Sequence, residues 1–279
     1  ECFNEKTLTL GAEDRNVTLT AERVSFASVQ YCDANGNPQT ATDVVIVGPR
    51  MGQTLRDGKW YVVEGEATME SLTVEGEVNL ILADGAKLTA KGGYKQAALA
   101  VEQGNALTIY GQTLGTGELV ATGGQGASGI GGDYMTDGGT VTINGGIITA
   151  TGGGDSSGIG GGYQSACGTV TINGGLVKAT GRMYSSGIGT GCYPVKGGQV
   201  TINGGTVVAT RGSESARDIG CVPGTDVVIR GGSVLASTAT IENAPVNGVD
   251  VAVHCVTVNV EKVESVERLR VEGLEDYGT

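Results

Sequence analysis

Residues 168–181 read GTVTINGGLVKATG, and close copies of this stretch lie on both sides of it. The copies are GTVTINGGIITATG at residues 139–152 and GQVTINGGTVVATR at residues 198–211. A second fragment accompanies them and reads SGIGGD, SGIGGG, SGIGTG and finally RDIGCV. Self-similarity at a fixed period indicates supersecondary units that stack on one another.

The spacing of the copies gives the length of one unit. The Asn of TING recurs at intervals of 29 and 30 residues, as Asn144, Asn173 and Asn203. The Ile of GIG recurs at intervals of 29, 29 and 31 residues, as Ile130, Ile159, Ile188 and Ile219. We therefore expect coils of about 29 residues, with these Asn and Ile residues as structural ladders.

Each unit has the alternation of strands, punctuated by Gly-Gly corners. In TVTING, Val170 and Ile172 share one face, and after the corner Val177 and Ala179 take the inward parity. GIG adds a third short strand with a single inward Ile. The sequence therefore predicts an all-β fold: a right-handed, single-stranded parallel β-helix, or β-solenoid, with three short strands per coil. Stacked Asn side chains at the first corner can hydrogen-bond from coil to coil.

The regularity of the pattern suggests three segments. Residues 43–240 are the expected β-helix, irregular at first and regular from the TVTING copies onward. Residues 1–42 also alternate and are expected to form a β segment that caps the open end, because an uncapped end exposes unpaired strand edges. Residues 241–279 are expected to be a second cap or the start of a further module.

Composition and charge limit the function classes. Formal net charge is −12, yet residues 123–232 carry 6 acidic and 6 basic side chains, which argues against a nucleic-acid groove. No apolar run approaches the roughly 20 residues of a membrane span, so we expect no membrane insertion. We also expect the chain to be part of a larger multidomain protein.

These motifs resemble a group of repeat-containing surface proteins of gut and oral bacteria, especially Firmicutes and also Bacteroidetes and spirochaetes. The resemblance rests on YCDANGNPQTATDV, WYVVEG, VNLILADGAKLTA, NALTIYGQ and the TVTINGG, ATGG and GIGGG series, and spans roughly residues 31–240. It implies a secreted or wall-associated right-handed β-helix, and hence an extracellular location.

The chain is also similar, more distantly, to β-helical carbohydrate-binding domains in which acidic residues beside a GI turn hold calcium. The equivalent positions here read GASGI, DSSGI, YSSGI and SARDI. Only Asp155 and Asp218 are acidic, and they stand at different offsets from the Ile. The resemblance therefore carries no complete calcium site to this chain, and we expect no other cofactor.

Residues that could carry chemistry are few. His254 is the single histidine, and the six cysteines lack CxxC spacing, so neither a His-based triad nor a zinc site is expected. Cys2 and Cys32 bracket the N-terminal segment and could form a disulfide. Carboxylates do not recur at matching positions in neighbouring coils, as glycoside hydrolysis requires. We therefore predict no catalytic residue and no metal ligand.

Tyrosines near GIG are the best binding candidates. Tyr134 and Tyr163 fall four residues after the GIG Ile, Tyr193 falls five after it, and Tyr184 lies just before it. Aromatic rings along one edge suit stacking on sugars or gripping a peptide. The polar neighbours that we expect to flank them are Asp133, Asp155 and Gln164. A stack that only stabilises the edge is the alternative.

The function expected from the sequence is a non-enzymatic bacterial surface module for adhesion or carbohydrate binding. Its partner would be a glycan or a surface protein of the host or of another bacterium. Two alternatives stay open: an enzyme like the β-helical polysaccharide lyases and glycoside hydrolases, and a spacer that holds another domain away from the cell. The binding hypothesis predicts that replacing Tyr134 and Tyr163 by Ala weakens glycan binding.

Overall fold

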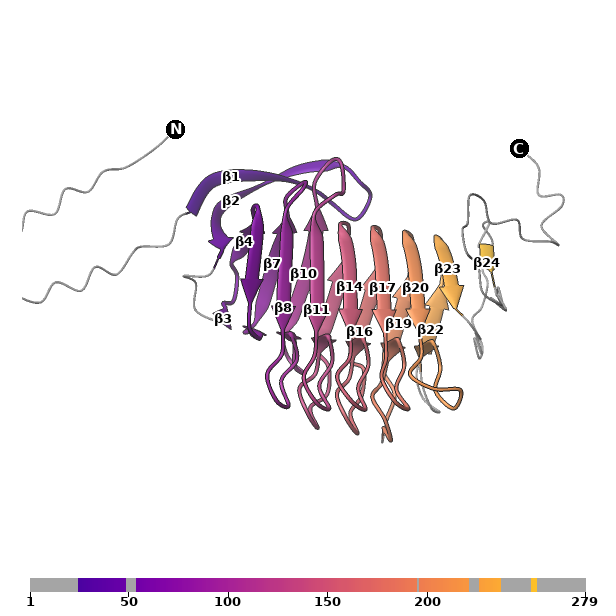
Figure 1. Ribbon diagram of the computed structural model, residues 1–279. Coiled ribbons are helices and arrows are strands. Elements are labelled where there is room, and N and C mark those ends of the chain that lie inside the picture. Colours follow the sequence, from indigo (N-terminus) through magenta and orange to yellow (C-terminus); the bar gives the residue numbers. More distant parts are fainter. Residues whose placement is uncertain (1–24, 49–53, 195, 221–225, 237–251, 255–279) are drawn as a thin grey trace, which may run out of the picture.

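The described part of the chain consists of strands joined by turns and loops, stacked coil upon coil. The structure is a computed structural model that describes residues 25–48, 54–194, 196–220, 226–236 and 252–254 (Figure 1). Figure 1 shows the coils side by side, with β1 and β2 laid across one side and loops projecting from the opposite side. The strands belong to three sheets.

Each coil contributes one strand to each sheet. Sheet A has nine strands, in the order β1 (Ser25–Cys32), β2 (Pro38–Val47), β4 (Trp60–Val63), β7 (Glu77–Leu82), β10 (Ala106–Gly111), β13 (Thr140–Ile143), β16 (Thr169–Ile172), β19 (Gln199–Ile202) and β22 (Asp226–Ile229). Sheet B has seven short strands, in the order β21 (Ile219–Gly220), β18 (Ile188–Gly189), β15 (Ile159–Gly160), β12 (Ile130–Gly131), β9 (Leu99–Ala100), β6 (Leu72–Val74) and β3 (Thr54–Leu55). Sheet C has eight, in the order β24 (Ala252–His254), β23 (Ser233–Ala236), β20 (Thr206–Thr210), β17 (Leu176–Thr180), β14 (Ile147–Thr151), β11 (Glu118–Thr122), β8 (Lys87–Lys91) and β5 (Glu66–Met69).

The copies of the repeat stack in parallel register, each residue on its equivalent. Val170 pairs with Val141 on one side and with Val200 on the other, and Ile159 pairs likewise with Ile130 and Ile188. The prediction of an all-β solenoid with parallel sheets, three strands per coil and coils of about 29 residues is confirmed. Right-handed winding stays a prediction.

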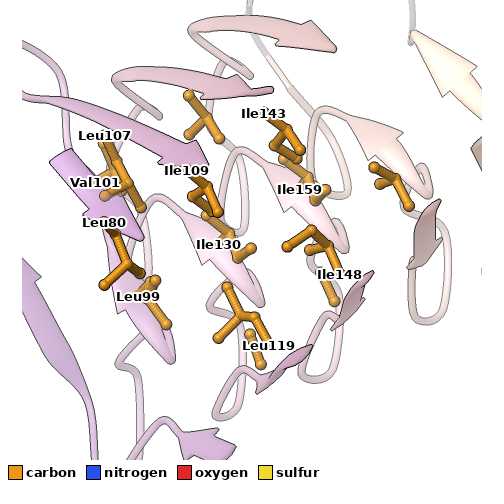
Figure 2. Packing of buried hydrophobic residues seen from close by; sticks show 14 of the residues in the cluster. Leu80, Leu99, Val101, Leu107, Ile109, Leu119, Ile130, Ile143, Ile148 and Ile159 are labelled. Carbon is orange, nitrogen blue, oxygen red and sulfur yellow. The ribbon is translucent and has the colours of Figure 1, made fainter. Parts of the chain in front are cut away.

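One apolar core runs through the stack because alternate side chains of all three sheets point inward. Figure 2 shows Ile109 and Ile143 from sheet A, Leu119 and Ile148 from sheet C and Ile130 from sheet B within it. All five side chains are fully buried. Burying one such side chain is worth about 1.5–3 kcal/mol, so each added coil brings several favourable contributions.

The corner between sheets A and C carries the asparagine ladder. Asn173 Nδ2 donates to Asn144 Oδ1 at 2.7 Å, and Asn203 Nδ2 donates to Asn173 Oδ1 at 2.7 Å. Arg230 follows in the next coil, and its Nη1 donates to Asn203 Oδ1 at 3.2 Å. The side chains at this corner therefore bind to one another.

The N-terminal hairpin covers the outer face of sheet A. β1 and β2 pair antiparallel, and β2 continues the sheet through the parallel pairing of Val45 with Tyr61. Val62 and Ile81 have the outward parity, yet they are fully buried in a cluster with the hairpin residues Ala41 and Val44. β2 spans the predicted boundary between residues 42 and 43, because one strand serves both the hairpin and the solenoid.

The described part of the C-terminal segment extends sheet C. β24 pairs in parallel with β23, with Ser233 opposite Ala252. Residues 252–254 thus add a strand to the solenoid instead of starting a separate sheet. Cys2 lies outside the described residues, so the predicted disulfide between Cys2 and Cys32 stays a prediction.

Candidate functional site

The two loops that flank each short strand of sheet B form one continuous edge. Because the strands of sheet B from β9 to β21 have only two residues each, the loop before such a strand and the loop after it emerge close together. Backbone hydrogen bonds join the loops of successive coils: Tyr134 N to Lys95 O at 3.1 Å, Tyr163 N to Gly126 O at 2.8 Å, and Cys192 N to Asp155 O at 3.2 Å. The scaffold thus holds equivalent loop residues of each coil in a row.

The structure brings the four tyrosines of the sequence analysis together. The Tyr134 and Tyr163 rings are stacked, with centroids 5.5 Å apart and planes at 14°. Tyr163 meets Tyr193 edge to face at 6.5 Å and 90°, and Tyr193 lies 6.4 Å from Tyr184 at 38°. We call these four residues the tyrosine edge.

Tyr193 departs from the stack because it occupies a different position in its loop. Tyr134 and Tyr163 lie four residues after the first residue of the short strand, where the next coil has the buried Cys192. Tyr193 lies one residue later, in the left-handed region with φ 52°, as do Met135 and Gln164. Its ring therefore leaves the backbone in another direction, and 67% of Tyr193 is exposed.

Two residues that the sequence analysis missed extend the row by one coil. The Lys95 ammonium lies over the Tyr134 ring, 4.1 Å from the centroid, and 5.5 Å from the centroid of Tyr94. Tyr94 is 77% exposed. Their loop, KGGYKQAALA, has no GIG motif, but Leu99 pairs in register with Ile130. Aligning Leu99 with the GIG Ile would have found them.

A groove opens beside the tyrosine edge at its N-terminal end. It has a volume of about 270 Å³ and is lined by Tyr94, Lys95, Gln125, Gly126, Tyr134, Asp155 and Tyr163. Gly126 is required here because a Cβ at this position would collide with the Tyr134 ring. The groove therefore joins aromatic surface to one cation, one carboxylate and one amide.

Asp133 has a structural part in this arrangement. Its Oδ1 accepts a hydrogen bond from Ala97 N at 2.7 Å, which ties its loop to the coil before. Burial raises the pKa of the Asp133 carboxyl, and the Ala97 hydrogen bond opposes that shift. Asp133 is not among the residues that line the groove, so the structure shows its part in loop support, and its contact with a ligand stays a prediction.

The other predicted polar residues lie at the tyrosine edge. Asp155 lines the groove, and Gln164 is exposed, with its Nε2 donating to the Tyr163 hydroxyl at 3.4 Å. Partial desolvation raises the pKa of the Tyr163 phenol, with smaller contributions from Tyr134, Cys192 and Asp155. The phenol thus stays neutral at physiological pH and can donate a hydrogen bond.

Cys192 and Asp218 lie in the loops beside sheet B, and their surroundings are defined by the structure. Burial and the nearby Asp155 raise the pKa of the Cys192 thiol to about 11, so the reactive thiolate is scarce near neutral pH. Among the described residues, no three His, Cys, Asp or Glu side chains gather as metal ligands would. Asp218, the second acid beside a GI turn, is buried and accepts a hydrogen bond from Arg211 N at 2.8 Å.

A second hollow, of about 380 Å³, lies beside the loops that lead from sheet B to sheet A. Its polar lining residues are Gln103, Asp137, Thr169, Lys196, Gln199 and Asp226. Asp137 Oδ1 accepts a hydrogen bond from Ala166 N at 2.8 Å, and its Oδ2 lies 3.0 Å from Lys196 Nζ. Both oxygens of Asp137 therefore link coils.

Comparison with known proteins identifies the repeats of the solenoid. A family model described as beta helix repeat matches residues 141–163, 170–192 and 200–221. The first matched segment runs from β13 through β14 and β15 to Tyr163. None of the curated proteins and none of the solved structures compared with the chain matches it.

In the described residues no helix has the length and apolar character to cross a membrane. Repeat match and fold together make the chain a β-helical repeat protein.

Proposed function

We propose that this protein is a non-enzymatic bacterial cell-surface module that binds carbohydrate through the tyrosine edge. The observation that carries the proposal is the unbroken row of contacts from Tyr94 and Lys95 through the tyrosine edge. The bacterial and extracellular parts of the proposal rest on the resemblance of the repeats to surface proteins. Adhesion to a cell or to a glycan-coated surface would follow from such binding.

Backbone conformation supports a function for these loops. Among the described residues, seven other than glycine have positive φ, and six of them lie in the loops of this edge: Lys95, Met135, Asp155, Gln164, Met183 and Tyr193. Equivalent positions in other coils hold glycine, as at Gly104 and Gly126. A left-handed conformation costs an ordinary residue about 1–2 kcal/mol. A scaffold alone would be served better by glycine, so the side chains are the reason to bear this cost.

The chemistry of the groove suits sugars. Sugar rings place C–H groups on aromatic faces and offer hydroxyl groups to amides, carboxylates and phenols. Tyr94 provides an exposed ring, while Gln125 and Asp155 provide the polar groups. The Tyr163 hydroxyl is already within 3.4 Å of an amide nitrogen, so it lies in a polar surrounding.

Catalysis is less well supported than binding. Glycoside hydrolysis uses two carboxyl groups roughly 5–9.5 Å apart, at least one of them free to accept or donate a proton. In the second hollow, the oxygens of Asp137 are occupied by Ala166 N and Lys196. Near the tyrosine edge, Asp133 accepts a backbone hydrogen bond. We therefore favour binding over a lyase or hydrolase activity.

A glycan array with matched variants tests the proposal. The test variant combines Tyr184→Ala with Tyr193→Ala, whose side chains are 55% and 67% exposed, so the fold loses little packing. The control is Leu114→Ala, a 75% exposed apolar side chain in a loop between sheets A and C. We expect saturable glycan signals for the wild type and the control, and loss of these signals in the double variant. An array without signals from folded wild-type protein would favour the spacer and contradict the proposal.

A further inference from the structure

We infer that the tyrosine edge takes an extended, uncharged oligosaccharide that runs along the solenoid axis across several coils. This inference rests on the proposed function and specifies its ligand. A compact ligand, such as one or two sugar units held in the groove, is the alternative. Three observations separate the two: the length of the row, the positions of its free ring faces and its charge.

The row of aromatic residues is longer than a compact sugar. Tyr94 lies in the loop before β9, Tyr134 follows β12, and Tyr193 follows β18. β9, β12, β15 and β18 are successive strands of sheet B. Strands of a sheet are about 4.8 Å apart, so the row extends roughly 14 Å along the axis. A single sugar ring cannot touch both of its ends.

The rings with free faces lie towards the ends of the row. Tyr134 is covered by the Lys95 ammonium from the coil before and by the Tyr163 ring from the coil after. Tyr193 stands perpendicular to Tyr163 and is largely exposed, as are Tyr184 beside it and Tyr94 at the other end. A ligand that stacks on both sets of exposed rings must be extended.

The middle of the row offers hydrogen bonds and not flat faces. Tyr163 lies between the two ends, with its hydroxyl 3.4 Å from the Gln164 amide. Asp155 lies beside it on the groove wall. A chain of sugars presents hydroxyl groups along its whole length, and these would meet the polar groups of the middle section. The groove alone, at about 270 Å³, is smaller than most pockets that bind small molecules.

Charge favours an uncharged chain. The loops that flank β9, β12, β15 and β18 carry three positive charges, from Lys95, Arg182 and Lys196, and four negative charges, from Glu102, Asp133, Asp137 and Asp155. A polyanion would find no surplus of positive charge here and would be repelled by a protein of formal net charge −12. A polycation would be repelled by Lys95, which already lies over the Tyr134 ring.

Isothermal titration with sugar chains of defined length tests the inference. The probes are chains of two to six units of β-1,4-linked glucose, β-1,3-linked glucose and β-1,4-linked mannose, together with the hexamer of α-1,4-linked galacturonic acid as the charged probe. We expect at least one neutral hexamer to bind about tenfold more tightly than its own dimer, as one additional aromatic platform would give. Tyr94→Ala and Tyr193→Ala should each reduce this preference for length, whereas Leu114→Ala should preserve it.

The outcomes that overturn the inference differ from those that overturn carbohydrate binding. Equal affinity for the dimer and the hexamer would show a compact site, and the proposed function would stand. Tighter binding of the galacturonic acid hexamer than of every neutral hexamer would contradict an uncharged ligand. Array signals confined to branched or short glycans, with no binding of any neutral hexamer, would also reject an extended ligand. Failure of every glycan on the array would reject the proposed function itself.

Discussion

The described residues of this solenoid include two aromatic clusters, and the clusters differ in what covers them. In the first, which we call the cap cluster, Tyr31 of β1 lies 4.7 Å from both Trp60 and Tyr110, measured between ring centroids. The N-terminal hairpin, through Tyr31, packs against Trp60 and Tyr110, and Gln112 Nε2 donates a hydrogen bond to Gln30 O of β1 at 2.8 Å. In the tyrosine edge the ring centroids lie 5.5–6.5 Å apart, none of the described strands lies over the rings, and Tyr184 and Tyr193 are mostly exposed.

The comparison shows that contact between aromatic rings does not by itself mark a binding site. In the cap cluster the rings fill the space between the hairpin and the outer face of sheet A, which otherwise would expose Val62 and Ile81. In the tyrosine edge several rings are carried on left-handed loop residues and face water. We therefore expect variants of the cap cluster to change stability alone and variants of the tyrosine edge to change binding.

The largest effect is expected in the cap cluster. Trp60→Ala removes a ring that contacts both Tyr31 and Tyr110. It should lower the free energy of unfolding by about 3 kcal/mol, the lower end for a buried aromatic residue because Trp60 is partly exposed. Chemical denaturation measures this loss. Glycan binding by the folded variant should match that of the wild type. If the variant is fully folded and does not bind glycan, the cap cluster also contributes to binding, and the proposed difference between the clusters is wrong.

A smaller loss of stability is expected in the tyrosine edge. Tyr134→Ala removes the stack on Tyr163 and the contact with Lys95, together worth about 1–2 kcal/mol, and should weaken glycan binding about tenfold. Tyr134→Phe keeps the ring and serves as the matched control. Denaturation and titration of both variants check the prediction, which fails if the Phe variant is as unstable as the Ala variant.

Variants at Tyr193 are expected to differ in stability but not in glycan binding. Tyr193→Gly should be more stable than Tyr193→Ala by about 1 kcal/mol, because glycine adopts φ 52° without the steric cost that alanine bears. Both variants should lose glycan affinity to the same extent. Thermal denaturation ranks their stabilities, and an Ala variant as stable as the Gly variant would mean that the left-handed conformation carries no cost here.

The smallest effect is expected on acidification. Hydrogen bonds from the backbone N–H of Asn37 and Asn35 lower the pKa of Asp33 in the turn of the hairpin, although slight desolvation opposes them. The stabilisation from Asp33 is therefore present above the unfolded pKa of about 3.9 and is lost as the pH falls through the lower folded value. Burial raises the pKa of Asp133, so protonation of this carboxyl at low pH does not lower the free energy of unfolding.

Fluorescence of Trp60 reports on this change, because the chain has a single tryptophan and it lies in the cap cluster. As the pH falls below about 4 we expect a shift towards the emission of exposed indole. Asp33→Asn keeps an acceptor oxygen that does not titrate and should flatten the profile. If the pH profile of this variant is identical to that of the wild type, the fluorescence change comes from a group other than Asp33.

Much of the scaffold was predictable because each coil repeats its neighbour. The parity of Val170 and Ile172 identified the inward face, and the recurrence of Asn173 identified the corner where the asparagine ladder forms. The placement of the tyrosines followed from their offsets to the GIG Ile. Periodicity carries this information because parallel, in-register stacking turns an offset in sequence into a position in space.

Other features were not predictable because they depend on contacts between residues that do not repeat. The hairpin over sheet A brings Gln30 to Gln112, a contact between segments with no common pattern. Tyr94 and Lys95 lie in a loop where the motif has diverged. The hydrogen bond from Ala97 N to Asp133 depends on how two successive coils fit together.

The most direct test of the account is an NMR titration of the aromatic ring signals with the glycan that gives the strongest array signal. The account predicts that ring resonances of Tyr94, Tyr163, Tyr184 and Tyr193 shift in a saturable way, while those of Tyr31, Trp60 and Tyr110 stay in place. Saturable shifts in the cap cluster without shifts in the tyrosine edge would contradict it.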